Sequence, residues 1–248
     1  MKIFIDPGHG GGSIGAVYKG RKEKDDTLAL SLEIKRQLSA FEGVEVRLAR
    51  EADTALSISE RVKAANLWGA DFYLSVHRNA VSPNKAEGAE VWCYSKIKAG
   101  GATYTKAEKI LAYMCENTGF VNRGVKLGAP NYNDFGVNRL TKMHSCLLEA
   151  GFIDSDKDNG IFDREFEEMA EGIARGLLEA VGYTGEKKKL LGDVNGDGSV
   201  DSSDARLILR AAVGLENVPY EEGDIDKDGK ITSADAREAL RRAVDKND

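Results

Sequence analysis

The chain has 248 residues, of which 42% are hydrophobic and 31% charged, an ordinary balance for a globular protein. No run of about 18 apolar residues occurs, so the sequence predicts no membrane-spanning helix. The net charge of −6 lies entirely in residues 192–248, which hold 14 acidic and 8 basic side chains, and no basic region indicates a nucleic-acid partner.

The first residues predict a short buried strand that runs directly into a glycine loop. Residues 2–5 are largely apolar, and residues 6–12 have the sequence DPGHGGG. Proline and glycine end the strand, and glycine lets the backbone turn tightly. His9 lies in this loop, where a histidine serves as a metal ligand, an acid–base group or a hydrogen-bonded loop residue. The spacing does not fit a phosphate-binding loop.

The segments that follow alternate between helical and strand patterns. Helices are predicted over about 27–41, from Ser57 or Ser59 to Gly69, over 102–118 and over about 163–181, and strands over 44–48, 72–76, 88–94 and 145–148. Residues 120–140, rich in Gly and Asn, are predicted to form loops that line a cleft. This alternation predicts an α/β fold with a mostly parallel twisted sheet and helices on both faces.

Three of the predicted strands end in a residue that can perform chemistry. His9 follows the first strand, His77 ends the strand over 72–76, and Glu149 ends the strand over 145–148. The C-terminal ends of parallel strands meet at one edge of a sheet, where α/β proteins bind their ligands. We therefore expect these three side chains to converge.

Two histidines and one carboxylate are the ligand set of a hydrolytic zinc site, and a second carboxylate would act as general base and acid. The residues alone leave the ligating carboxylate open among Glu23, Asp6 and Glu149. His144 is a rival ligand and Cys146 a rival nucleophile. Both lie an odd number of positions from Glu149, so they should face the opposite side of their strand.

The three cysteines, Cys93, Cys115 and Cys146, are an odd number and lack a disulfide-rich setting, so we expect buried free thiols. Because residues 2–5 already have the pattern of a core strand, we expect no secretion signal in this sequence. We therefore expect a protein that acts on its target after cytoplasmic synthesis and release at lysis, or an extracellular protein whose leader has been removed.

The C-terminal part contains an internal repeat after a polar linker at residues 184–191. Residues 193–206 recur 31 positions later as residues 224–237, and each copy has the carboxylate spacing of a calcium loop with glycine at its sixth position. The predicted calcium ligands are Asp193, Asn195, Asp197, Ser199 and Asp204 in the first loop, and Asp224, Asp226, Asp228, Lys230 and Asp235 in the second. Ser199 and Lys230, at the seventh position, contribute their backbone carbonyl oxygens. Short helices over 205–213 and 236–244 complete a small all-α domain of two loop–helix repeats. We expect it to hold two structural Ca²⁺ ions and to fold poorly without them.

Four motifs in residues 1–183 together resemble the zinc-dependent N-acetylmuramoyl-L-alanine amidases of the amidase-3 type. They are IDPGHGG at 5–11, EKD at 23–25, SVHRNA at 75–80 and LEAGFI at 148–153. The resemblance implies one catalytic zinc held by His9, Glu23 and His77. It also implies that Glu149 is the catalytic carboxylate, and that zinc-activated water cleaves the amide between N-acetylmuramic acid and L-alanine in peptidoglycan.

Two positions near these motifs depart from the family pattern. His144 stands where the family often has proline, and Ser13 where an acidic residue is common. Arg78 and Asn79, inside the third motif, are candidates to contact substrate; the alternative is that they satisfy loop carbonyl groups.

The repeat is similar to a type I dockerin over residues 192–246, because each loop lacks a leading helix and has Asp at its twelfth position. That resemblance implies binding to a cohesin module on a scaffold or cell surface. The pairs Ser202-Ser203 and Ser233-Ala234 occupy the positions where dockerins place specificity residues. On a lytic amidase, such a module has two further options, namely binding a cell-wall ligand and self-association.

We therefore predict a catalytic domain over 1–183, a linker over 184–191 and a dockerin-like domain over 192–248. The predicted protein is a peptidoglycan amidase of the phage or prophage endolysin type. The alternatives are a secreted autolysin, a cellulosome-associated wall amidase docked through cohesin, and a non-catalytic cell-wall-binding protein.

Overall fold

The computed structural model describes residues 1–129 and 133–245. The chain divides into two compact units, which are described separately. The first comprises Met1–Leu38 and Gly43–Thr184, and the second comprises Ser39–Glu42 and the chain from Gly185 onward. None of the helices in the described residues is long and apolar enough to cross a membrane.

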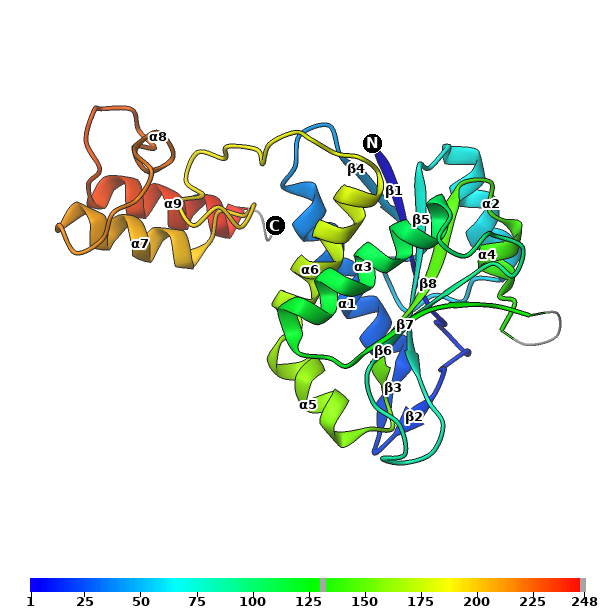
Figure 1. Ribbon diagram of the computed structural model, residues 1–248. Coiled ribbons are helices and arrows are strands. Elements are labelled where there is room, and N and C mark those ends of the chain that lie inside the picture. Colours follow the sequence, from blue (N-terminus) through cyan, green and yellow to red (C-terminus); the bar gives the residue numbers. More distant parts are fainter. Residues whose placement is uncertain (130–132, 246–248) are drawn as a thin grey trace. The chain divides into compact units, whose positions relative to one another are not determined.

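A six-stranded sheet forms the centre of the first unit (Figure 1). Its strands lie in the order β4 (Glu45–Leu48), β1 (Lys2–Pro7), β5 (Phe72–Asn79), β8 (His144–Phe152), β6 (Ala89–Cys93) and β7 (Asn122–Leu127). Every neighbouring pair is parallel except β8 and β6, which run antiparallel. A short hairpin of β2 (Val17–Tyr18) and β3 (Arg21–Lys22) precedes the first helix. The predicted α/β class with a mostly parallel sheet is confirmed.

Helices cover both faces of the sheet (Figure 1). One face carries α1 (Glu23–Ser39), α3 (Ala102–Thr118) and α6 (Phe166–Ala180), and the other carries α2 (Ile58–Trp68) and α4 (Gly136–Leu140). Beneath α2 and α4, one apolar cluster joins Ala65, Val137, Phe4, Tyr73 and Leu147. This cluster lies on the same face of the sheet as the side chains that form the candidate site, and it packs the strands that carry them.

Three local predictions are wrong. The helix expected over 163–181 is two helices, α5 (Asp156–Arg164) and α6, which meet at Glu165. The loops expected over 120–140 contain strand β7 and helix α4, because an edge strand that pairs on one side only has a weak apolar pattern. Helix α1 begins at Glu23 rather than near Thr27, since carboxylates are favoured in the first turn of a helix.

The second unit consists of two loop–helix repeats. Its helices are α7 (Ser202–Ala212), α8 (Tyr220–Gly223) and α9 (Ser233–Asp245), and its core contains Val194, Val200, Ile208, Ile225 and Ala239. The helices α7 and α9 begin three residues before their predicted starts, and the short helix α8 was not expected. Asp201 caps α7, and Asp204 completes a capping box, which explains the earlier start.

Candidate active site

The three predicted residues reach one edge of the sheet from three adjacent parallel strands. Strand β1 lies beside β5, and β5 lies beside β8, with His77 directly opposite Glu149. His9 follows the end of β1 by two residues. Because side chains alternate along a strand, His77 shares its face with Tyr73 and Ser75, the face that α2 covers.

Glu23 lies between the two histidines. Its Oε2 atom is 3.1 Å from His9 Nε2, and its Oε1 atom is 2.9 Å from His77 Nδ1. The centroids of the two imidazole rings are 5.0 Å apart. One ligand atom from each of the three residues lies within 4.8 Å of the others, which is a geometry that can hold a metal ion.

Backbone amides fix the Glu23 carboxylate in place. The N–H of Ala16 donates to Oε2 at 2.8 Å, and the N–H of Arg78 donates to Oε1 at 3.1 Å. Burial would raise the pKa of Glu23, but hydrogen bonds from His77 and His9 hold that pKa well below its usual range. An ionised carboxylate between two imidazoles is a donor set that fits zinc.

Two glycines allow this close packing. A Cβ atom on Gly8 would lie 2.4 Å from His77 Cε1. At Gly15, where φ is +69°, a Cβ atom would lie 2.5 Å from Glu23 Oε2 and 2.8 Å from His9 Cδ2. Any other residue at either position would therefore displace a side chain of the cluster.

Glu149 is a half-buried carboxyl group beside the cluster. Its Oε2 atom is buried and has no hydrogen-bond partner within the part of the chain that the structure describes. Desolvation by burial raises the pKa of Glu149 to about 7, to which the nearby Glu23 and Glu90 carboxylates contribute. A carboxyl group with such a pKa can both accept and donate a proton near neutral pH.

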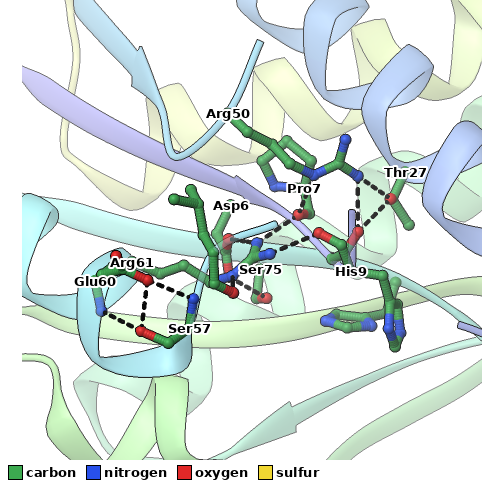
Figure 2. A network of polar contacts seen from close by, with 12 residues as sticks. Asp6, Pro7, His9, Thr27, Arg50, Ser57, Glu60, Arg61 and Ser75 are labelled. Atoms are coloured by element: carbon green, nitrogen blue, oxygen red, sulfur yellow. Dashed lines mark hydrogen bonds and ion pairs between the residues drawn. The ribbon is translucent and has the colours of Figure 1, made fainter. Parts of the chain in front are cut away.

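Asp6, another of the three carboxylates considered as a ligand, forms all of its contacts with other residues (Figure 2). It is 1% exposed, and its Oδ1 atom pairs with Arg61 Nη1 at 2.5 Å. The hydroxyl groups of Tyr73 and Ser75 donate to its Oδ2 atom at 2.7 and 2.9 Å. Asp6 therefore anchors the end of β1, and Glu23 is the carboxylate that the two histidines contact.

Two buried arginines hold the glycine loop through its carbonyl groups (Figure 2). Arg61 donates to the carbonyls of Pro7 and His9 at 2.7 and 2.6 Å, and Arg50 donates to those of Pro7 and Gly8 at 3.2 and 2.8 Å. His9 has a φ of 60°, a left-handed conformation that is costly for a residue with a Cβ atom. The arginines stabilise that conformation and so fix the direction of the His9 ring.

Neither arginine was predicted from the sequence, although the position of Arg61 within its helix indicates that it is buried. Arg61 lies on the buried face of α2, directly before Val62 and four residues before Ala65. A charged residue on the apolar face of a helix indicates a buried partner of opposite charge. Arg50 follows a strand without any such pattern, so nothing in its neighbourhood marks it.

Arg78 and Asn79, the candidate substrate contacts, point to different places. The guanidinium of Arg78 is buried on the other face of the sheet, where it donates to Asp26 at 2.6 Å and to Asn159 at 2.7 Å. Its 2% exposure argues against the predicted contact with substrate. Asn79 donates to Glu90 Oε1 at 3.0 Å, on the face of the site.

The rival residues lie away from the cluster. His144 Nδ1 is 2.7 Å from the Thr103 hydroxyl of α3, on the opposite face of the sheet from His77. Cys146 is a buried free thiol, as are Cys93 and Cys115, and burial raises the pKa of the Cys146 thiol well above its usual value. A thiol that stays protonated is a poor nucleophile.

A cavity of about 270 Å³ opens beside the cluster. His9 and His77 line one side of it, and Leu56, Ile58 and Phe135 supply apolar walls. The cavity therefore offers space next to the three ligand candidates for an uncharged portion of a ligand.

The second unit holds the two predicted calcium loops. Carboxylate oxygens of Asp224, Asp226 and Asp235 lie within 4.8 Å of one another, a group that can hold a cation. In the first loop, Asp193 accepts hydrogen bonds from the amides of Gly196, Asp197 and Gly198. Backbone amides thus orient the carboxylates of both loops, since Asp235 likewise accepts from the amides of Ile225 and Asp226.

Two protein families match the chain. Residues 3–179 match the family described as N-acetylmuramoyl-L-alanine amidase, and residues 191–242 match the type I dockerin domain.

The chain is also similar to individual proteins. The sporulation-specific N-acetylmuramoyl-L-alanine amidase of Bacillus subtilis is 38% identical over 183 residues, covering 73% of this chain and 68% of that protein. The endolysin of Bacillus phage SPP1 is 32% identical over 183 residues, covering 71% of this chain and 65% of that protein. The crystal structure of N-acetylmuramoyl-L-alanine amidase from Clostridium difficile 630 is 31% identical, with a TM-score of 0.67, and covers 74% of this chain and 98% of that chain.

Proposed function

The chain belongs to the N-acetylmuramoyl-L-alanine amidase family, and from that premise we propose that it hydrolyses its peptidoglycan amide with a zinc ion held by His9, Glu23 and His77. The scissile bond joins the lactyl group of N-acetylmuramic acid to the L-alanine of the peptide stem. The observation that carries the proposal is the group of three ligand atoms within 4.8 Å, beside a carboxyl group with a free, buried oxygen.

Each residue has a separate role in the proposed reaction. A bound zinc ion would polarise the scissile carbonyl and lower the pKa of a water molecule toward about 7. Glu149 accepts a proton from the attacking water through its unpartnered oxygen, and then donates a proton to the leaving amine. Its raised pKa of about 7 suits both steps at neutral pH. Arg61 and Arg50 keep His9 in its strained conformation, so the ligand geometry is formed before substrate binds.

The test measures which bond is cut in purified peptidoglycan, with and without a zinc chelator. We expect new N-terminal alanine, no new reducing sugar, and loss of the reaction on chelation with recovery on added Zn²⁺. New reducing sugar would mean that a glycosidic bond is cut. Alanine release that survives complete zinc removal would contradict the metal role of the three residues.

For the C-terminal part we propose a calcium-dependent docking role. The dockerin match over residues 191–242 supports binding to a cohesin module, and so supports the cellulosome-associated alternative. Two calcium ions, one in each loop, would order the binding surface. Native gels with a panel of cohesin modules, with and without a calcium chelator, test this role. Calcium-dependent complexes are expected, and their absence across the panel would favour wall binding or self-association.

The endolysin role is one of several that the relatives leave open. The similarity to a phage endolysin supports it, and the similarity to a Bacillus subtilis amidase supports an autolysin equally well. Removal of residues 184–248 separates the alternatives. Full lysis of whole cells by the remaining chain favours an endolysin or an autolysin, and lysis that requires a cohesin-bearing surface favours a docked wall amidase.

A further inference from the structure

Two basic side chains, Arg123 and Lys126, lie near Glu149 on the face of the sheet that carries the candidate site. We call the line of residues that runs across the strands from His77 through Glu149 to Glu90 the catalytic row. Across the sheet, His77 is opposite Glu149, and Glu149 is opposite Glu90 on the antiparallel strand β6. Directly opposed residues of neighbouring strands share a face, with Cβ atoms about 4.5–5.5 Å apart. Arg123 and Lys126 of the edge strand β7 both donate to Glu90, so they extend this row beyond Glu149.

The Glu90 carboxylate accepts hydrogen bonds from two neutral donors and two cationic side chains. It is 2% exposed, and its Oε1 atom accepts from Asn79 at 3.0 Å and from Trp92 Nε1 at 2.9 Å. Its Oε2 atom accepts from Arg123 Nε at 2.7 Å and also from Lys126 Nζ. One carboxylate therefore faces two cations, and the group carries a surplus positive charge.

Both cations keep capacity for a further partner. Each side chain is 33% exposed. Arg123 uses Nε for Glu90 and Nη1 for the carbonyl of Glu87, and its Nη2 donates no hydrogen bond within residues 1–129 and 133–245. The Lys126 ammonium lies 5.3 Å from the Trp92 ring centroid, and the Arg123 guanidinium 5.0 Å from that of Phe152, so both are held in place. Exposed, positioned donors with spare N–H groups suit a carboxylate ligand.

The proposed reaction fixes which part of the substrate lies there. Glu149 donates its proton to the amine of L-alanine, so the peptide stem leaves from the Glu149 side of the row, and the histidines lie toward the muramic acid. The residue that follows L-alanine in the stem is a glutamate linked through its γ-carboxyl group, which leaves its α-carboxylate free. One residue of extended chain spans about 3.3–3.6 Å, whereas strand β7 lies two strand spacings, roughly 9–10 Å, from β8. The Arg123 and Lys126 side chains shorten that distance because they reach back to Glu90 on β6, the strand next to Glu149.

We propose that Arg123 and Lys126 bind this free α-carboxylate, so that the enzyme selects stems whose second residue is glutamate over stems in which that group is amidated. The inference rests on the proposed amidase reaction, and it adds a subsite that discriminates between two chemical forms of peptidoglycan. In an isoglutamine stem, the neutral amide cannot form the charge-assisted hydrogen bonds that a carboxylate forms with these cations.

The experiment compares two substrates that differ in one group, N-acetylmuramoyl-L-alanyl-D-glutamate and N-acetylmuramoyl-L-alanyl-D-isoglutamine, each with its γ-carboxyl group capped as the methylamide, so that only the α-group differs. The readout is the ratio of their kcat/KM values, measured by amine release from the zinc-loaded protein. For the wild-type chain we expect a ratio of roughly 10–100 in favour of the carboxylate, the range typical of hydrogen bonds to charged groups. A ratio near 1 for the wild-type chain would overturn the inference.

Single substitutions locate the subsite. Lys126→Gln and Arg123→Gln each leave one cation on Glu90, so neither creates an uncompensated buried charge. Each should lower the ratio several-fold, with the loss falling on the carboxylate substrate. Lys157→Gln is the matched control, because it removes the same charge from an exposed pair with the neighbouring Glu87 and should keep the wild-type ratio.

The outcomes separate this inference from the proposed function. Variants that keep the wild-type ratio would overturn the subsite while leaving the amidase reaction intact. If the wild-type protein releases no amine from either substrate or from purified peptidoglycan, the proposed function fails, and the subsite fails with it.

Discussion

At the scale of single residues, Glu149 links catalysis to stability. Its pKa of about 7 in the folded protein lies above the ordinary value of 4.5, because burial disfavours the charged form. The folded state therefore binds this proton more tightly than the unfolded state does. The stability that results is fully present below about pH 4.5 and is lost as the pH rises through 7.

We predict that Glu149→Gln abolishes most activity and stabilises the metal-free protein at alkaline pH. Loss of the acid–base group should lower kcat by about 10²–10⁴-fold. In urea unfolding of the first unit at pH 8.5, the free energy of unfolding of the variant should exceed that of the wild type by about 3 kcal/mol, because the pKa difference is about 2.5 units and each unit is worth about 1.4 kcal/mol. At pH 4 the two should unfold alike.

Glu116→Gln on the exposed face of α3 is the control for removing a carboxylate, and its stability should follow the wild type at both pH values. A Glu149→Gln protein with no gain at pH 8.5 would mean that Glu149 is solvated. Retained wall lysis by that variant would contradict the catalytic role of Glu149.

Substitution of Arg61 should weaken zinc binding, although Arg61 is not one of the three proposed ligands. Its bonds to Asp6 and to the carbonyls of Pro7 and His9 need the planar fork of a guanidinium, which an ammonium group cannot reproduce. We expect Arg61→Lys to weaken zinc affinity by about 10–100-fold, as is common for residues that orient ligands. Competition with a chromogenic chelator measures this affinity without any assay of activity.

The lysine variant keeps the buried positive charge beside Asp6, so it tests geometry rather than the loss of an ion pair. Arg175→Lys, an exposed arginine of α6, is the matched control and should bind zinc as the wild type does. Equal zinc affinity in the Arg61→Lys and wild-type proteins would show that the glycine loop holds His9 without the arginine.

At the scale of secondary structure, the start of helix α2 can be tested, because two nearby serines are candidates for its N-cap. The sequence allows the helix to begin at either Ser57 or Ser59, and the structure places the cap at Ser57, whose hydroxyl accepts from the Glu60 amide at 3.2 Å. The Glu60 carboxylate in turn accepts from the Ser57 amide at 2.7 Å. We predict that Ser57→Ala lowers the free energy of unfolding of the first unit by about 1 kcal/mol.

Ser59→Ala is the matched control, since Ser59 lies inside the first turn and is exposed. It should change the free energy of unfolding by less than about 0.5 kcal/mol, as expected for an exposed position without a special role. A larger loss for Ser59→Ala than for Ser57→Ala, in urea unfolding, would contradict the assigned cap.

The elements differ in how far the sequence could predict them. Strands β1, β5 and β8 were predictable because each is a dense apolar run that stops at a polar residue, and their shared edge followed from parallel pairing. The antiparallel direction of β6 could not be predicted, because the direction of a strand depends on its connections and its partner strand and not on the residue pattern within it. Strand β7 was missed since its Asn122, Arg123 and Lys126 are polar.

The same distinction applies to the candidate site. Its histidines and Glu149 end buried strands, so their convergence follows from the fold. Glu23 lies in a charged stretch whose pattern predicts an exposed surface, and only the family resemblance singled it out. Its 4% exposure arises from a long-range contact with the ends of two strands, which local sequence does not encode.

At the scale of the whole molecule, the two units should respond to different metals. The second unit has a small core, and its loops bring carboxylates such as Asp224, Asp226 and Asp235 close together. Without a cation these groups repel, and a unit of this size has little apolar burial to offset the repulsion. The first unit buries a six-stranded sheet between helices and contains no part of these loops.

We therefore predict that calcium removal unfolds the second unit and leaves the amidase reaction intact. In calorimetry, a calcium-selective chelator should abolish or strongly lower one transition while the other keeps its midpoint, and amine release from soluble substrate should stay unchanged. Asp224→Asn should lower the same transition at limiting calcium. Glu216→Gln, an exposed carboxylate outside both loops, is the control. Loss of amine release on calcium removal would mean that the units are energetically coupled, and an unchanged thermogram would mean that the second unit folds without its ions.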